Sequence, residues 1–353
     1  MRINFIVPFP ATKPSGGVKV MYEYANQMAE RGHAVTIVHG IKQMHKKMKS
    51  PLWYKRFLYF VKGASRPGWF KLHPQIKSIV VPEITNKYVP DADATIATWW
   101  ATATQVSKLS EAKGIKYNLI QGYEVWDGYE ELVHHSYDLP LEHIVISKHL
   151  QKVVQKISGK APVYIPNAVS TKSFFETTPI QHRKPASVCM MFSEQKLKGS
   201  KYGLQALIKL KNVFPDLTVD LISVPKKPEG LPDWIRYNRN PSNIREIYNR
   251  NSIFLSPSLS EGWGLTCTEA MLCGCCLVCT DIGGHREFAV NGENAYTVDA
   301  ENVDQIFEAI KTLIENDEKR YKLAREGRLH ISKKFSWDKS ATQLENLFTA
   351  HDK

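Results

Sequence analysis

The chain has 353 residues, of which 43% are hydrophobic and 23% charged, and this composition excludes disordered, collagen-like and low-complexity chains. The 47 Lys and Arg residues against 35 Asp and Glu residues give a formal net charge of +12. The length predicts two domains. No stretch approaches the roughly 18 to 20 apolar residues of a membrane-spanning helix. The short apolar run after Met1 ends at Pro8, which argues against a signal peptide. We therefore expect a cytoplasmic protein that could also lie on the inner face of the plasma membrane.

The first half of the chain predicts alternating strands and helices. Residues 3–7 form a short apolar run, residues 9–17 read as a loop, and apolar residues from Val18 onward recur at helical spacing. Gly32 is expected to end this helix before a strand over 34–38, and such a unit implies a parallel sheet. Further strands are expected at 78–81, 94–98, 118–121 and 143–147.

A second alternating series begins after the segment Val163-Tyr-Ile-Pro-Asn167, which predicts a domain boundary there. Its strands are expected at 187–192, 217–223, 252–255 and 277–279, and its helices at 203–213, at 303–314 and from about 318 to the end. The stretch 225–241, rich in Pro, Lys and Arg, is expected to be mostly loop. Two consecutive α/β domains predict a ligand in a crevice between them, at the carboxyl ends of the strands.

The positive charge is concentrated in a segment, residues 42–71, that mixes basic and aromatic side chains. No acidic residue occurs between Glu30 and Glu83. The segment carries Lys42, Lys46, Lys47, Lys49, Lys55, Arg56, Lys62, Arg66 and Lys71, interleaved with tryptophan, tyrosine and phenylalanine. This mixture favours an anionic membrane surface or another polyanion, with a solvated basic face as the alternative. Nucleic acid is not expected as a partner, because none of its common binding signatures appears.

The most informative motif extends from Ser258 to Gly274. The sequence Glu261-Gly262-Trp263-Gly264-Leu265 predicts a flexible loop that leads into a helix, and Glu269 falls one to two turns into that helix. Glycines allow a ligand to approach the backbone, and the free amides at a helix start favour an anion. Carboxylates accept hydrogen bonds from sugar hydroxyls. The motif therefore predicts a site for a diphosphate flanked by sugar groups, unless both acids merely favour the start of a helix.

Two further loops are candidate anion sites. Gly16 and Gly17 precede the first helix, where a Gly pair is either an ordinary turn or a phosphate or sugar contact. Lys196, Lys198 and Lys201 follow a strand, where their charges would suit a diphosphate unless they form a solvated turn. The six cysteines read as small buried residues, because Cys276-x-x-Cys279 lies on an apolar strand with no partner pair. No metal site is expected.

These motifs make the chain resemble a retaining glycosyltransferase of the GT-B fold, family 4. Ser258–Val298 is similar to that family's C-terminal pattern, with Glu261 and Glu269 at its Glu-x7-Glu spacing and Gly283, Gly284 and Glu287 at its Gly-Gly-x-x-Glu motif. The resemblance implies two Rossmann-like doubly wound domains, over 1–166 and 167–335. A last helix over 336–353 is expected to cross back to the first domain.

The resemblance also implies roles for individual residues. Glu261 and Lys198 are expected to be catalytic, Glu261 by contacting donor-sugar hydroxyls and Lys198 by neutralising the leaving diphosphate. Glu269 is expected to hold the nucleotide ribose. The remaining donor-binding set is Gly16, Gly17, Lys196, Lys201, Gly262, Trp263, Gly264 and Leu265. The family's Arg is replaced here by Phe192, and its usual N-domain His is missing from the stretch that contains Tyr123, Glu124 and Trp126, which we expect on the acceptor side.

The resemblance thus implies a retaining, metal-independent transfer of a sugar from a nucleotide-sugar to a glycan or lipid-linked acceptor, as in polysaccharide or glycolipid synthesis. The nucleotide-sugar is a substrate, and no cofactor is expected. Two alternatives remain open, namely a GT-B nucleotide-sugar 2-epimerase and a non-catalytic module that binds a polyanion.

Overall fold

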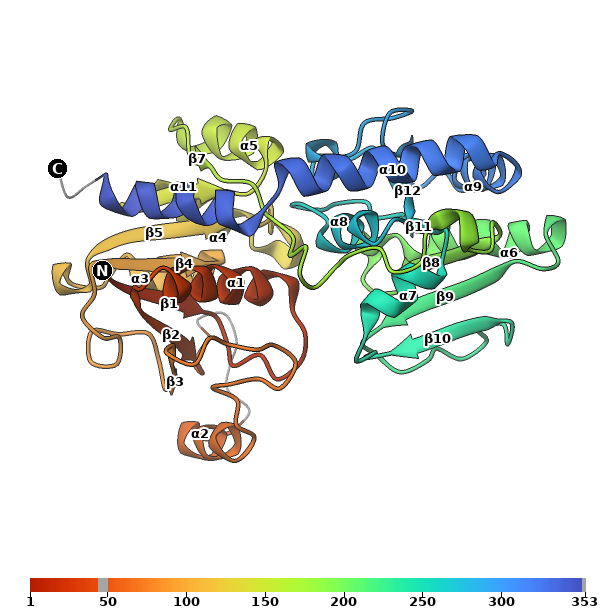
Figure 1. Cartoon of the computed structure of the whole chain (residues 1–353). Coiled ribbons are helices and arrows are strands. Elements are labelled where there is room, and N and C mark those ends of the chain that lie inside the picture. Colours follow the sequence, from red (N-terminus) through yellow and green to blue (C-terminus); the bar gives the residue numbers. More distant parts are fainter. Residues whose placement is uncertain (44–49, 351–353) are drawn as a thin grey trace. The chain divides into compact units, whose positions relative to one another are not determined.

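The computed structural model describes residues 1–43 and 50–350, and the chain divides into two compact units (Figure 1). Unit 1 comprises Met1–Asn167 and the segment that begins at Trp337, and unit 2 comprises Ala168–Ser336. These boundaries lie one residue from those expected from the sequence. Within the described residues, no helix combines the length and the apolarity that crossing a membrane requires.

Unit 1 is built on a seven-stranded parallel sheet in the order β3-β2-β1-β4-β5-β6-β7. Its strands are β1 (Arg2–Val7), β2 (Ala34–Gly40), β3 (Lys77–Val81), β4 (Ala94–Thr98), β5 (Ile115–Ile120), β6 (Glu142–Val145) and β7 (Val163–Tyr164). Its helices are α1 (Gly16–Glu30), α2 (Leu52–Val61), α3 (Trp100–Val106), α4 (Glu130–Asp138), α5 (Lys148–Ser158) and α11 (Trp337–Thr349).

The first β–α–β unit forms as its pattern predicts. The buried face of α1 carries Val18, Met21, Ala25 and Met28, which recur every three or four residues. Gly32 follows the helix with a φ of +87°, a conformation that glycine adopts without strain. Helix α11 packs against α1, so the last described helix belongs to unit 1.

Unit 2 is built on a six-stranded parallel sheet in the order β10-β9-β8-β11-β12-β13. Its strands are β8 (Ser187–Met191), β9 (Thr218–Ser223), β10 (Ile235–Arg239), β11 (Ile253–Ser256), β12 (Cys276–Thr280) and β13 (Tyr296–Val298). Its helices are α6 (Ser200–Val213), α7 (Ile244–Arg250), α8 (Leu265–Leu272), α9 (Val303–Glu315) and α10 (Asp317–Lys334). Two doubly wound parallel sheets confirm the predicted α/β class.

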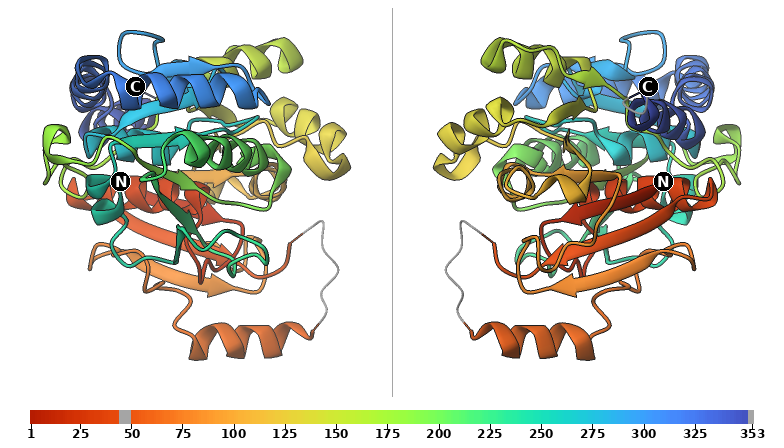
Figure 2. Two further views of the ribbon diagram at one scale, coloured as in Figure 1. Left: turned by 90° about the vertical axis from the view of Figure 1, so that its right-hand side faces the viewer. Right: turned by 90° about the vertical axis from the view of Figure 1, so that its left-hand side faces the viewer.

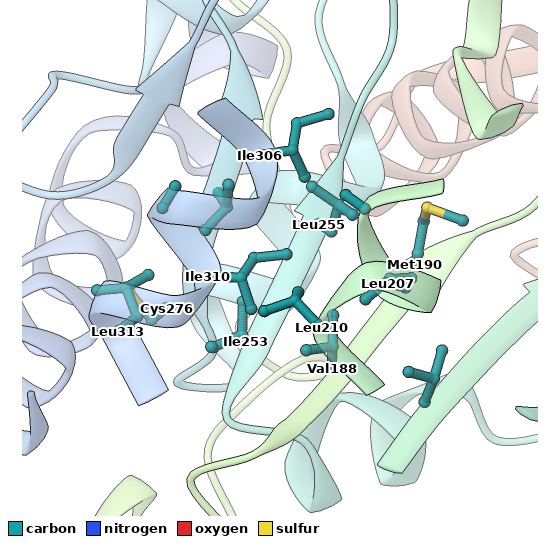
Figure 3. Close-up of a cluster of buried hydrophobic side chains, with 14 of the residues drawn as sticks. Val188, Met190, Leu207, Leu210, Ile253, Leu255, Cys276, Ile306, Ile310 and Leu313 are labelled. Atoms are coloured by element: carbon teal, nitrogen blue, oxygen red, sulfur yellow. The ribbon is translucent and has the colours of Figure 1, made fainter. Parts of the chain in front are cut away.

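The main core of unit 2 lies where α6 and α9 pack over the central strands. Figure 3 shows Leu207 and Leu210 of α6 and Ile306 and Ile310 of α9 gathered with side chains from β8 and β11. These four residues are fully buried. The cysteines are also buried and free, as the sequence predicted, and among the described residues no group of His, Cys, Asp and Glu is arranged to hold a metal ion.

One strand was not anticipated. The stretch 225–241 is mostly loop, as expected, but it also contains strand β10 (Ile235–Arg239) at the edge of the sheet. Ile235 is buried, and Arg236 pairs with Asp220 of β9. Arg236, one of the basic residues that indicated a loop, thus lies in a strand and pairs with this buried carboxylate.

Candidate functional site

The candidate site of unit 2 lies at the carboxyl ends of its two central strands. β8 and β11 are neighbours in the sheet, but the helices that follow them pack in different places, α6 against α9 and α8 against α10. This is the point at which the strand order reverses, where doubly wound sheets bind ligands because the loops after the two strands part there. The loops are residues 192–199 after β8 and residues 257–264 after β11.

These two loops bring Lys198 and Glu261 together. Lys198 Nζ lies 2.8 Å from Glu261 Oε1, and Ser258 Oγ donates a hydrogen bond of 2.9 Å to the same oxygen. The side chain of Lys198 is 39% exposed and that of Glu261 is 17% exposed. The predicted catalytic pair is therefore a direct ion pair, and both groups can be reached by a ligand.

Glycines allow the two loops to touch. Gly199, with a φ of +60°, lies so close to the second loop that a Cβ there would come 1.8 Å from the carbonyl oxygen of Pro257. The amide of Leu259 then donates a 2.8 Å hydrogen bond to the carbonyl of Leu197. The main chain that carries Lys198 is thus fixed to the main chain that leads to Glu261.

Gly264 stands immediately before α8 in a left-handed conformation, with a φ of +110°. His285 lies beneath it, because a Cβ on Gly264 would meet His285 Cδ2 at 3.0 Å. The His285 ring is buried, Nδ1 donates a 2.8 Å hydrogen bond to the carbonyl of Thr280, and burial lowers the pKa of the ring. A neutral imidazole therefore supports the turn from which the helix begins.

Glu269 lies farther into α8 and is mostly enclosed, with 5% of its surface exposed. The hydroxyl of the buried Tyr248 lies 3.4 Å from Glu269 Oε2, at the long end of hydrogen-bond distances. A carboxylate at this depth needs polar partners to offset the loss of water. The two acids of the motif thus differ, since Glu261 faces solvent more than Glu269 does.

The other predicted residues of this site have more peripheral places. Lys196 and Lys201 are exposed near Lys198, and the Lys201 ammonium lies 5.8 Å from the Tyr202 ring centre. Gly262 and Leu265 are half-buried. Phe192, which stands where the resembled family has an Arg, packs edge-on against Tyr237 at the border of the core.

Trp263 supports the loop from inside. Its side chain is 2% exposed and packs against Phe288 and Phe335, at ring distances of 5.7 and 5.0 Å. The indole is therefore part of the hydrophobic interior of unit 2.

Unit 1 has its own reversal point, between β1 and β4. Gly16 and Gly17 form the start of α1 after β1, and Gln121 follows β5. Gln121 Nε2 donates hydrogen bonds to the carbonyl of Gly17, at 3.0 Å, and to Thr98 Oγ1, at 2.8 Å. One amide thus joins the ends of two strands to the Gly pair.

The predicted acceptor-side residues follow Gln121. The Tyr123 hydroxyl lies 2.8 Å from His134 Nε2, and the two rings are stacked. Burial raises the pKa of Glu124 to about 8, although a hydrogen bond from the Trp100 amide opposes the shift. Trp126 is 45% exposed. The segment thus offers an aromatic surface beside a carboxyl group that titrates near neutral pH.

Sequence reasoning missed several residues that shape these sites. No functional role was predicted for Ser258, Gly284 or His285. The signal that could have indicated one is their position in the loops that follow β11 and β12. Trp99, directly after β4, has a φ of +76°, which is unusual for a bulky residue. No feature of the sequence indicates that conformation.

Comparisons with known proteins agree with this architecture. Residues 233–330 match the family described as "Glycosyl transferases group 1". A D-inositol 3-phosphate glycosyltransferase of Corynebacterium glutamicum is 28% identical over 171 residues, 44% of this chain and 41% of that protein. The GtfA subunit of a UDP-N-acetylglucosamine–peptide N-acetylglucosaminyltransferase of Streptococcus pneumoniae is 25% identical over 205 residues, 54% of this chain and 40% of its own. The matched stretches thus span about two fifths of these curated relatives.

Solved structures extend the likeness to the whole chain. Anabaena HepE in complex with UDP-glucose superposes with a TM-score of 0.76 over 99% of this chain and 100% of that one, at 15% identity. The sucrose-phosphate synthase of Thermosynechococcus elongatus gives a TM-score of 0.72 over 99% of both chains, also at 15% identity. Together with the two parallel sheets, these likenesses show that the chain has the two-domain GT-B fold, with the group 1 glycosyl transferase pattern over residues 233–330.

Proposed function

We propose that this chain is a retaining glycosyltransferase of family 4, which moves a sugar from a nucleotide-sugar to a hydroxyl of a glycan or of a lipid-linked acceptor. The observation that carries the proposal is the Lys198–Glu261 ion pair, 2.8 Å long, at the reversal point of the unit 2 sheet. A cation, a carboxylate and the start of a helix lie there, and each suits one part of a sugar diphosphate: the cation and the helix start suit the phosphates, and the carboxylate suits the sugar hydroxyls. The matched family and the relatives named as glycosyltransferases support the same reaction class.

Lys198 and Glu261 would exchange partners when a donor binds. The diphosphate would compete with Glu261 for the Lys198 ammonium and accept further hydrogen bonds from amides near Gly264 and Leu265. Glu261 would then be free to accept hydrogen bonds from the donor sugar. Ser258, which already donates to Glu261, would hold the carboxylate in place.

The bond between the anomeric carbon and the diphosphate breaks as the acceptor oxygen forms its bond to that carbon. The electron pair leaves with the diphosphate, whose growing charge Lys198 would stabilise. Attack from the same face preserves the anomeric configuration, and the departing phosphate takes the acceptor proton. This route requires no protein nucleophile, and we propose that it proceeds without a metal ion.

Other residues would complete the two substrate sites. Glu269 would contact the ribose, Lys196 and Lys201 would add positive charge near the diphosphate, and Gly16 and Gly17 would offer main-chain contacts. Tyr123, Glu124 and Trp126 would face the acceptor, where an exposed indole suits the apolar face of a sugar ring.

The test begins with calorimetry of UDP, GDP and dTDP binding, followed by transfer assays with the matching nucleotide-sugar. UDP is the first probe, because HepE and GtfA were solved with it. Lys198→Ala should lower kcat by about 10²- to 10³-fold with folding intact. Lys209→Ala is the matched control, because Lys209 also forms a 2.7 Å ion pair in unit 2, with Asp304, on an exposed helix surface.

Three further readouts separate the parts of the proposal. Proton NMR early in the reaction should show the donor's anomeric configuration in the product, and activity should persist in EDTA. Glu261→Gln should lower transfer, and Glu269→Ala should weaken nucleotide binding. Full transfer activity in both Lys198→Ala and Glu261→Gln would refute the site. Formation of an epimer from donor alone, or salt-sensitive polyanion binding without transfer, would refute the reaction.

A further inference from the structure

Helix α2 exposes the side that a soluble helix usually buries. Trp53, Phe57 and Phe60 are spaced at i, i+4 and i+7, so they share one face, and their residues are 72%, 58% and 83% exposed. Val61 extends this face and is 65% exposed. The half-buried residues Lys55, Leu58 and Tyr59 lie on the opposite side. None of the ten residues of the helix is buried.

The helix lies at the edge of unit 1. It contacts β3, the edge strand of the sheet, and both views of Figure 2 show it beyond that edge, at the bottom of the picture. A shallow groove of about 630 Å³ lies between the helix and Pro82, the residue that follows β3. Its other lining residues are Leu52, Trp53, Arg56, Phe57 and Phe60. An exposed groove lined by three large aromatic side chains is suited to bind an apolar part of another molecule.

The charged side chains on and directly after the aromatic face are basic. Arg56 lies on the aromatic side, Lys62 follows the helix, and both are exposed. Since no acidic residue occurs between Glu30 and Glu83, the segment has no carboxylate of its own to neutralise them. Glu83, the first acidic residue after this stretch, forms an ion pair with Lys42, with 3.4 Å between Lys42 Nζ and Glu83 Oε2.

We propose that α2 docks on an anionic lipid bilayer. A helix with aromatic side chains on one face and basic side chains beside them lies in the plane of the interface, with the rings among the upper acyl chains and the cations at the headgroup phosphates. A protein partner would have to be both apolar and acidic to match the same surface. This docking is independent of the proposed reaction, and it would bring a lipid-linked acceptor within reach of unit 1.

The experiment is flotation of the full chain with vesicles of phosphatidylcholine alone and with vesicles that also contain phosphatidylglycerol. We expect recovery with the anionic vesicles only, and its loss at high salt. The triple variant W53S/F57S/F60S and the double variant R56Q/K62Q should each reduce binding at least about tenfold. The matched controls are I208S/V213S/L329S, which removes exposed apolar side chains of unit 2, and K152Q/K172Q, which removes exposed lysines.

The controls should bind vesicles as the parent chain does, and all variants should keep its melting temperature, because every substituted side chain is exposed. Nucleoside diphosphate binding should also stay unchanged, which separates this proposal from the proposed function. Equal recovery with both vesicle types, or unchanged binding in both α2 variants, would overturn the proposal. Concentration-dependent association of the parent chain that W53S/F57S/F60S abolishes, without vesicle binding, would overturn it in favour of a second copy.

Discussion

Replacing Gly284 by alanine should disturb the loop that carries Glu261 without altering any group that touches a substrate. A Cβ at Gly284 would lie 2.4 Å from the carbonyl oxygen of Glu261 and 2.8 Å from the amide nitrogen of Trp263. Gly284 has a φ of −68°, so alanine itself fits the backbone and the cost is purely steric. The Glu261 oxygen would have to withdraw by at least 0.6 Å to reach the 3.0 Å below which such contacts essentially never occur.

That displacement sets the expected magnitudes. Overpacking of this kind costs about 1 to 3 kcal/mol, which lowers the melting temperature of a unit of this size by roughly 3 to 10 °C. Functional groups must be held within about 0.5 Å of their productive positions, and a 1 Å error can cost about 100-fold. We therefore expect kcat/KM to fall by about 10- to 100-fold.

Scanning calorimetry measures the melting temperature, and the transfer assay measures kcat/KM. Gly68→Ala is the control, because a Cβ there would meet nothing within 4 Å and its φ is not positive. That variant should match the parent chain in both measurements. If Gly284→Ala also matched the parent chain in both, the packing of residue 284 against the Glu261 main chain would not position the site.

Two further predictions concern buried carboxyl groups. Burial alone would raise the pKa of Asp220, but hydrogen bonds from Arg250, Asn251, Arg236 and Asn238 outweigh it and lower the pKa from 3.8 to about 2. This depressed pKa adds about 2 kcal/mol to the free energy of unfolding above about pH 4, and this contribution is lost as the pH falls to 2 and below. Urea unfolding should show Asp220→Asn less stable at pH 7, with the difference shrinking between pH 4 and pH 2; a constant difference would contradict this. For Glu124 the sign is reversed, because its pKa rises from 4.5 to about 8, so the carboxylate costs stability as the pH rises through that interval. Glu124→Gln should therefore gain stability over the parent chain between pH 5 and pH 8, and a gain independent of pH would show that burial does not perturb this group.

Much of the fold could be predicted because the residues that form it follow simple periods. The buried face of α1 repeats every three or four residues, and the central strands of both sheets, such as β1 and β11, are short buried runs. β10 could not be predicted, since Arg236 and Asn238 look like loop residues until Asp220 is placed beside them. Helix α2 was not predicted either, because it has no buried face.

The candidate site was predictable in its residues but less so in its geometry. Lys198 and Glu261 each follow a strand, and the structure joins them because those strands are neighbours at the reversal point. The burial of Trp263 depends on Phe288 and Phe335, which are distant in sequence. The support that His285 gives to Gly264 likewise depends on a contact between separate loops.

The return of α11 to unit 1 has a consequence for synthesis on the ribosome. Trp337 packs edge-on against Tyr24, and the ring centres of Phe348 and Tyr117 are 4.9 Å apart. Glu345 forms a hydrogen bond with the imidazole of His33. Unit 2 is continuous in sequence and can collapse as it emerges, whereas unit 1 lacks these partners until residues 337–348 have been synthesised. A nascent chain paused before α11 is made would leave Tyr24 and Tyr117 uncovered and accessible to chaperones. Unit 1, whose first residues are synthesised before unit 2, can therefore complete its fold only after unit 2 has been made.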